Sequence, residues 1–150
     1  MAQQLGLPET ARVGFLSLLR IVDDRVVCHD RRYFPPLIAE RFDFSLLAHR
    51  SLPEVLEELG GRPITAVDWE TEIVPASREV ARSLGITPGV LVLVNSGLES
   101  FEDGVPAQVV LMHYRIDRVK FRFSIDRRPG RSASASPPRP LPGDGDRDRP

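Results

Sequence analysis

VGFLSLLRIV-DD-RVVCHDRRYF, residues 13–34, is the stretch of sequence that decides the fold. Both runs are rich in β-branched and large apolar residues, and the Asp23-Asp24 pair between them is a turn signal. The stretch therefore predicts a β-hairpin. Pro35-Pro36 should end it, because proline has no N–H to donate to a ladder of strand hydrogen bonds.

Further strands are predicted on the C-terminal side of this hairpin. Residues 90–100 and 105–116 are strand-like runs separated by Phe101-Glu102-Asp103-Gly104, which predicts a second hairpin. Residues 64–74 predict a strand of their own, and the alternating run VKFRFSI, 119–125, predicts a last, half-exposed strand. Because hairpins dominate, the sheet should be mostly antiparallel.

Trp69 and Ile73 share one face of the predicted strand at 64–74, because alternate residues of a strand point the same way. Large apolar side chains are usually buried. The simplest interpretation places both in the hydrophobic core.

Two helices are predicted between the strands. Residues 51–59 carry the first: Ser51 can cap its start, Glu54 completes a capping box, and Gly60 can end it. The second helix is predicted at 76–85. Helices set among hairpins predict an α+β fold in which the helices pack on the antiparallel sheet.

Part of the chain repeats. Ala2, Leu5, Gly6 and Leu7 match Ala81, Leu84, Gly85 and Ile86, and Asp24 matches Asp103, all at one constant offset. A helix–hairpin unit used twice predicts an internal pseudo-repeat. By that logic a strand and most of a helix would precede Met1, so we expect either a start internal to a longer product or a partner that covers the open sheet edge.

Length and composition predict one folded domain at 1–126 and a disordered tail at 127–150. The tail holds six of the 14 prolines and no aromatic residue, so it has little apolar surface to bury. Its six arginines and three aspartates leave a charge of −4 on residues 1–126, which argues against a nucleic-acid-binding face. No secretory signal or membrane span is visible, which predicts a cytoplasmic protein without membrane contact.

The sequence contains no recognisable catalytic or metal-binding motif. Cys28 and His29 are adjacent in a predicted strand and point to opposite faces, so they cannot act together. Cys28 is best interpreted as a small buried thiol. His29, His49 and His113 lack the spacing of metal ligands, and we expect no metal and no cofactor.

Several stretches together resemble the UTRA domain (UbiC transcription regulator-associated), the effector-binding half of GntR-type regulators of the HutC subgroup. They are LGLPETARV at 5–13, RVVCHDRRYFP at 25–35, Ser51-Leu52 before PEVLEEL, ASREVARSLGITPGVLVLV at 76–94, and DGVP with HYRIDRVKFRFSI within 103–125. The resemblance covers about residues 2–125. It implies the fold of chorismate pyruvate-lyase, which the UTRA domain shares.

The resemblance also implies a ligand site. In the family, a cleft beside the sheet binds small, often anionic metabolites. Arg20 matches the second arginine of a strand motif that grips the anion, and Asp30 matches a ligand-facing glutamate. Ser51 matches a serine at a helix start, and Tyr114 and Arg115 match a closing aromatic–arginine pair.

The chemistry of these residues fits that role, although simpler roles exist. A guanidinium offers a planar fork of donors for a carboxylate or phosphate, and a helix start offers free N–H groups. The structural alternatives are an Arg20–Asp30 salt bridge, a helix cap at Ser51, a core aromatic at Tyr114, and an Arg115–Asp117 pair that holds the last turn.

Four departures from the family pattern make the predicted cleft less polar. Leu18 replaces the first arginine of the strand motif, Pro53 replaces an aromatic residue, Val109-Val110 stand where polar or aromatic residues are common, and Ile116 replaces a glycine. A phosphorylated sugar therefore becomes a poorer candidate, and an apolar or aromatic acid a better one.

The resemblance implies a non-enzymatic sensor that regulates transcription through ligand binding and homodimerisation. DNA would be contacted through a separate winged helix-turn-helix outside this chain. The alternatives are an enzyme of the chorismate-lyase type, which a single surviving arginine in the strand motif disfavours, and a ligand-free dimerisation partner of full-length regulators.

Overall fold

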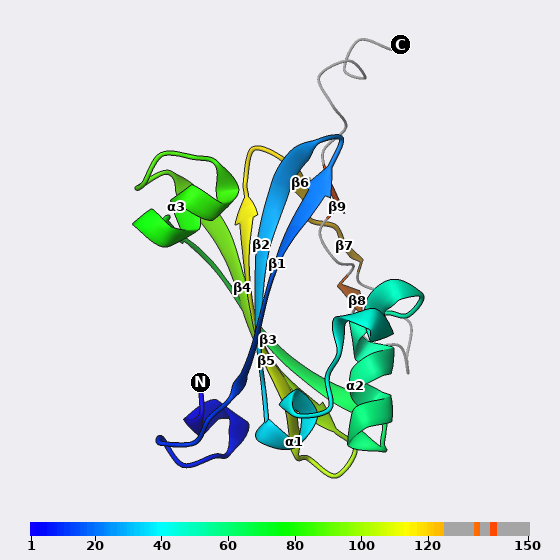
Figure 1. The fold of residues 1–150 in the computed structure, drawn as a ribbon. Helices are drawn as coiled ribbons and strands as arrows, with labels where there is room; N and C mark the ends of the chain where they lie inside the picture. The colour runs from blue at the N-terminus through cyan, green and yellow to red at the C-terminus, as the bar shows by residue number, and fades with distance from the viewer. Residues whose placement is uncertain (125–133, 136–138, 141–150) are drawn as a thin grey trace. The chain divides into compact units, whose positions relative to one another are not determined.

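A five-stranded sheet forms the framework of the protein. The computed structural model describes residues 1–124, 134–135 and 139–140. The strand order is β1-β2-β5-β4-β3 (Figure 1). The strands are β1 (Gly14–Val22), β2 (Arg25–Phe34), β3 (Ile64–Pro75), β4 (Leu91–Phe101) and β5 (Pro106–Arg115). Both predicted hairpins join neighbouring strands of this sheet, and the mostly antiparallel α+β prediction is confirmed.

The two hairpins turn by different means. Asp23 and Asp24 both have positive φ, 48° and 58°, as a two-residue turn that matches strand twist requires. The β4–β5 turn instead places Gly104 at φ 79°, and the Gly104 N–H donates to the carbonyl of Phe101 at 2.9 Å. Aspartate tolerates the left-handed region better than most residues, which explains how an Asp-Asp pair can make the first turn.

The chain divides into two compact units, which are described separately. Unit 1 comprises Met1–Leu18, Asp30–Glu72 and Val94–His113, and unit 2 comprises Leu19–His29, Ile73–Leu93 and Tyr114–Pro150.

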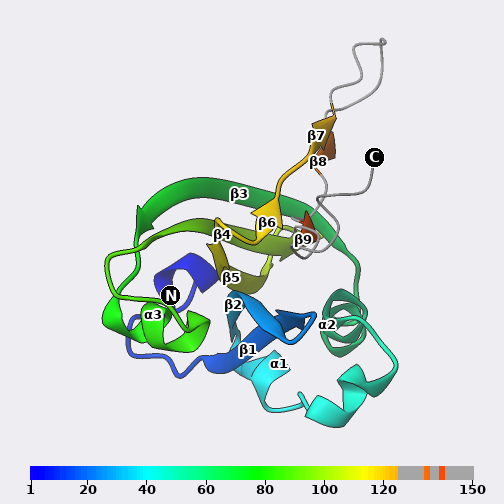
Figure 2. The same cartoon turned by 90° about the horizontal axis from the view of Figure 1, so that it is seen from above.

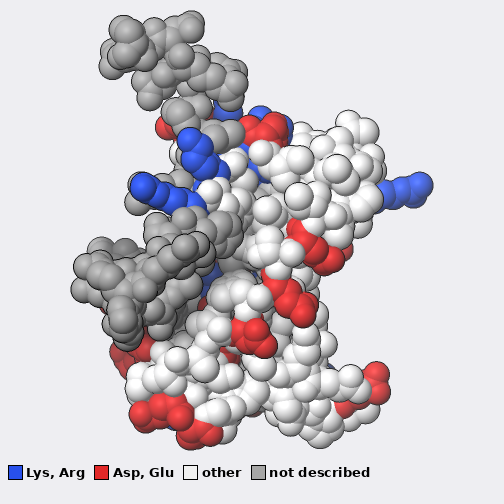
Figure 3. Space-filling view, turned by 180° about the vertical axis from the view of Figure 1, so that it is seen from behind, with Lys and Arg blue, Asp and Glu red and all other residues white. Residues whose placement is uncertain are grey.

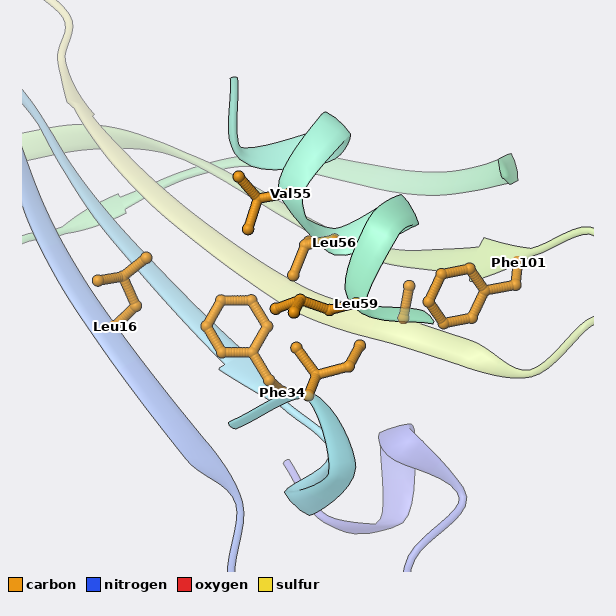
Figure 4. Packing of buried hydrophobic residues seen from close by; sticks show 8 residues of the cluster. Leu16, Phe34, Val55, Leu56, Leu59 and Phe101 are labelled. Atoms are coloured by element: carbon orange, nitrogen blue, oxygen red, sulfur yellow. The ribbon is translucent and has the colours of Figure 1, made fainter. Parts of the chain in front are cut away.

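Unit 1 has its core beneath helix α2 (Leu52–Gly60). Val55, Leu56 and Leu59 are buried on one face of this helix, as the apolar spacing predicts. They pack with Leu16 and Phe34 of the first hairpin and with further buried residues of the cluster (Figure 4). The sequence pattern of residues 35–50 does not indicate a particular secondary structure. In the structure this segment contains the helices α1 (Pro36–Ala39) and η2 (Phe44–Ala48).

Unit 2 is built around helix α3 (Arg78–Leu84). The Ser77 hydroxyl accepts from the N–H of Val80 and so caps the helix start. Val80, Ala81 and Leu84 are buried. Cys28 in this unit is fully buried, which confirms the prediction of a buried thiol.

The predicted repeat is visible in backbone hydrogen bonds at the end of η1 (Gln3–Leu5) and the end of α3. Leu7 N–H donates to the carbonyl of Ala2 at 3.0 Å, and Ile86 N–H donates to that of Ala81 at 2.9 Å. Gly6 and Gly85 follow with φ of 68° and 64°. The two helix ends therefore use the same αL termination at the offset seen in the sequence.

The strand predicted at 119–125 differs from the structure. It is split into β6 (Val119–Lys120) and β7 (Phe123–Ser124). These pair with β9 (Arg139–Pro140) and β8 (Ser134–Ala135). Ile125, and most of the tail predicted to be disordered, lie outside the described residues.

The prediction that Trp69 and Ile73 belong to the core is wrong. Trp69 is 41% exposed and Ile73 is 60% exposed. Strand β3 stands at one edge of the sheet, beside β4 (Figure 2), and nearly all of its residues are exposed. An alternating pattern fixes which residues share a face, but not whether the chain covers that face. Among the described residues, no helix is long and apolar enough to cross a membrane.

Candidate functional site

Unit 1 contains a buried row of polar side chains that crosses three strands. Arg32 donates from Nε and Nη2 to the two carboxylate oxygens of Asp30, at 2.9 and 3.1 Å. It also donates from Nη1 to Oε1 of Gln108 at 3.1 Å. Gln108 in turn donates from Nε2 to Glu99 at 2.5 Å. We call these four residues the buried polar chain.

Local geometry explains how the chain forms. Asp30 and Arg32 are two apart on β2, so their side chains point to the same face of the strand. Strand β5 lies between β2 and β4, which places Gln108 between Arg32 and Glu99. The guanidinium meets the carboxylate through both of its edge nitrogens, the geometry in which this pair is strongest.

Burial makes this arrangement costly. Asp30 is 1% exposed, Arg32 8%, Gln108 0% and Glu99 9%. Removing charges from water costs several kcal/mol per ion, and a well-packed apolar replacement is often as stable. Polar groups buried at such cost are candidates for a functional role.

Asp30 is the one predicted site residue that lies in the buried polar chain, and its partner Arg32 was missed. A salt bridge between Arg20 and Asp30 was the pairing expected from the sequence as the alternative to ligand binding. Spacing offered a better signal, because an acid and an arginine two apart on one strand share a face and can pair. Arg20 itself is an exposed residue of β1 in unit 2.

Ser51 occupies the predicted cap position at the start of α2. Both its backbone N–H and its hydroxyl donate to the same oxygen of Glu54, at 2.7 Å each. These hydrogen bonds, the side-chain one first, lower the pKa of the Glu54 carboxyl below its usual value. The predicted capping box is confirmed. The Ser51 hydroxyl thus forms a hydrogen bond within the first turn of the helix. This is the helix-cap role given above as the alternative to ligand binding.

Arg115 and Tyr114 lie in unit 2. Arg115 donates to both carboxylate oxygens of Asp117, at 3.0 and 2.6 Å, and this hydrogen bonding lowers the pKa of Asp117. Arg115 also reaches the carbonyl of Leu84 at 3.5 Å, close to the end of α3. Tyr114 is 4% exposed and meets Phe121 edge to face, with ring centroids 5.7 Å apart.

The arginine–acid pairs decide what the two units can do chemically. The guanidinium groups of Arg32 and Arg115 are each neutralised by an aspartate, so neither presents an unpaired positive charge to an anion. The buried polar chain ends instead at the carboxylate of Glu99, an acceptor for a hydroxyl or amine. Val109 and Val110 of the same strand as Gln108 are buried, at 3% and 0% exposure. Among the described residues, no cluster of three or more His, Cys, Asp or Glu side chains could hold a metal ion.

The family model described as the UTRA domain matches residues 1–120. The chain belongs to the UTRA domain family. No curated protein matches this UTRA domain.

Solved structures share its fold. The ligand-binding domain of a GntR-family transcriptional regulator from Bordetella bronchiseptica is 22% identical, with a TM-score of 0.74 over 83% of this chain and 78% of that one. A GntR-family regulator from Enterococcus faecalis V583 is 24% identical, with a TM-score of 0.73 over 81% and 87% of the two chains. The PhnF C-terminal domain is 25% identical, with a TM-score of 0.65 over 77% and 73%.

Proposed function

We propose that this UTRA domain is the small-molecule sensor of a GntR-type transcription regulator and has no enzymatic role. The observation that carries the proposal is the family match over residues 1–120, together with a fold shared with a ligand-binding domain of that class. In this function an effector changes transcription by binding the domain. A separate winged helix-turn-helix outside this chain contacts DNA in the cytoplasm, and the sensor acts as a homodimer.

The buried polar chain is the part of unit 1 that we assign to effector recognition. Its members come from three neighbouring strands, so a ligand that displaces one hydrogen bond perturbs the whole row. Arg20, Ser51, Tyr114 and Arg115 remain candidate ligand contacts from the family resemblance.

An apolar or aromatic organic acid is the effector class that we favour over a phosphorylated sugar. A phosphate carries up to two negative charges and needs unpaired cationic donors. Arg32 and Arg115 are each already paired with an aspartate. A single carboxylate on an apolar body demands less of this charge.

Thermal melting with a panel of metabolites tests the proposal. A ligand at about 100 times its Kd stabilises the folded state by about 2.7 kcal/mol, which raises the Tm by several degrees. We expect such a shift from aromatic or apolar acids, and its loss in Asp30→Asn. Glu9→Gln, which changes an exposed acid in a turn, is the matched control.

Two outcomes would contradict parts of the proposal. A strong shift with phosphorylated sugars and none with aromatic acids overturns the effector class. Release of 4-hydroxybenzoate from chorismate by the wild-type protein overturns the non-enzymatic assignment.

A further inference from the structure

Strand β3 has two unlike faces, and both are exposed in the part of the chain that the structure describes. Val67, Trp69 and Ile73 alternate along one face and are 49%, 41% and 60% exposed. Trp69 lies flat enough against β4 that a side chain at Gly97 would collide with its ring, and the Thr71 hydroxyl bonds to Asn95 at 2.9 Å. The side chains of Trp69 and Thr71 are therefore fixed against β4, while much of this face is exposed to solvent.

The opposite face of β3 is a row of acids. Asp68, Glu70 and Glu72 occupy alternate positions and are all exposed. Within the described part of the chain, none of them makes an ion pair or side-chain hydrogen bond. On the face drawn in Figure 3, acidic side chains likewise stand in separate groups on a largely uncharged surface. Three like charges in a row on an edge strand repel one another and favour a cationic neighbour.

The segment 119–123 has the complementary pattern. Its sequence alternates the apolar residues Val119, Phe121 and Phe123 with the basic residues Lys120 and Arg122. Lys120 and Arg122 are exposed, and neither side chain has an ion-pair partner among the residues that the structure describes.

The pairing that this segment makes within the chain is poor. In β6 and β9, Lys120 stands opposite Arg139, and Val119 stands opposite Pro140. Proline has no N–H to donate to this strand pair. Both β6 and β7 are only two residues long. A longer strand with complementary side chains would replace these contacts with little loss of free energy.

We propose that β3 of one copy pairs with residues 119–123 of a second copy, and that a two-fold axis repeats this contact. An antiparallel register with Phe121 opposite Trp69 places Lys120 opposite Glu70 and Arg122 opposite Asp68. Each copy carries one acidic strand and one basic strand, so each copy can supply both members of the contact. Pairing of β3 with β3 of the partner is disfavoured, because it would bring the acid rows together.

This surface rests on the homodimer of the proposed function but not on any effector. The test uses Glu70→Lys and Lys120→Glu in the full chain, studied alone and as an equimolar mixture by analytical ultracentrifugation. Alone, each variant places like charges across both contacts, so we expect dimerisation at least about tenfold weaker than in the wild type. Mixed, the two variants restore opposite charges at both contacts, so we expect a heterodimer of wild-type affinity that weakens with added salt.

Controls and contrary results separate the possibilities. Glu9→Lys and Arg12→Glu change exposed charges in unit 1 outside its strands and should leave the dimer intact. Circular dichroism confirms that each variant is folded. A wild-type protein that is monomeric overturns the homodimer itself, whereas single variants that dimerise normally overturn only this surface. Variants that stay monomeric when mixed place the contact within one chain and also overturn it.

Discussion

Two arginine–aspartate pairs in this UTRA domain have the same local design and opposite surroundings. Asp30 and Arg32 in unit 1, like Arg115 and Asp117 in unit 2, are two residues apart and joined by two hydrogen bonds. In the first pair the side chains are 1% and 9% exposed, whereas in the second pair the Arg115 side chain is 14% exposed and the Asp117 side chain is 60% exposed. Water therefore stabilises the Asp117 carboxylate of the second pair, whereas both charges of the first pair are shielded from water.

Breaking the buried pair should have the largest effect. Arg32→Met removes the guanidinium that pairs with the buried Asp30 carboxylate, which should lower the free energy of unfolding by about 3–5 kcal/mol. Arg115→Met is the matched control in the exposed pair and should cost no more than about 1 kcal/mol. Urea denaturation of both variants measures the difference. Equal losses would mean that burial does not distinguish the pairs.

Replacing both members of the buried pair should cost less than replacing one. Asp30→Leu with Arg32→Met removes both charges together, and apolar replacements of buried ion pairs are often neutral. Gln108 then loses one partner, so some loss remains. We expect a favourable coupling free energy on the order of 2 kcal/mol in a double-mutant cycle. Additive losses would show that the two side chains act independently. The double variant should also fail to respond to any effector that stabilises the wild type.

Gln108 extends the buried pair to Glu99. Gln108→Leu keeps much of the side-chain volume but leaves Glu99 without its donor, so we expect a loss of about 1–3 kcal/mol in the free energy of unfolding. Gln4→Leu changes an exposed glutamine and should have little effect. A loss at Gln108 no greater than at Gln4 would show that the chain beyond Arg32 contributes nothing.

Features of the fold with local causes could be predicted from the sequence. The Asp23-Asp24 turn, the Ser51–Glu54 capping box and the glycine helix ends are each specified by residues within a few positions of one another. The Arg115–Asp117 pair, the alternative to a ligand role for Arg115, is local in the same way.

Features with distant causes could not be predicted. The exposure of Trp69 depends on β3 lying at the sheet edge, which pairing of strands far apart in sequence decides. The link from Arg32 to Gln108 requires β5 to lie beside β2, although a signal for the Asp30–Arg32 pair was present in the spacing. Alternation at 119–125 predicted one continuous strand, whereas the structure has two strands of two residues each, because the alternation says nothing of the strand's partner.

The Arg115–Asp117 pair should be detected in the titration of Asp117 rather than in the free energy of unfolding at neutral pH. Hydrogen bonds from Arg115 lower the pKa of Asp117 below its usual 3.8, so the pair stabilises the folded state above that value. The contribution is lost as the pH falls through the lowered pKa, when the carboxyl becomes protonated. Carboxyl-carbon NMR should therefore show the Asp117 pKa rising towards 3.8 in Arg115→Met, with little change in Arg12→Met, which alters an exposed arginine outside the strands. Solvent screening keeps the effect on unfolding well under about 1 kcal/mol. An Asp117 pKa that does not move would show that the two hydrogen bonds do not persist in solution.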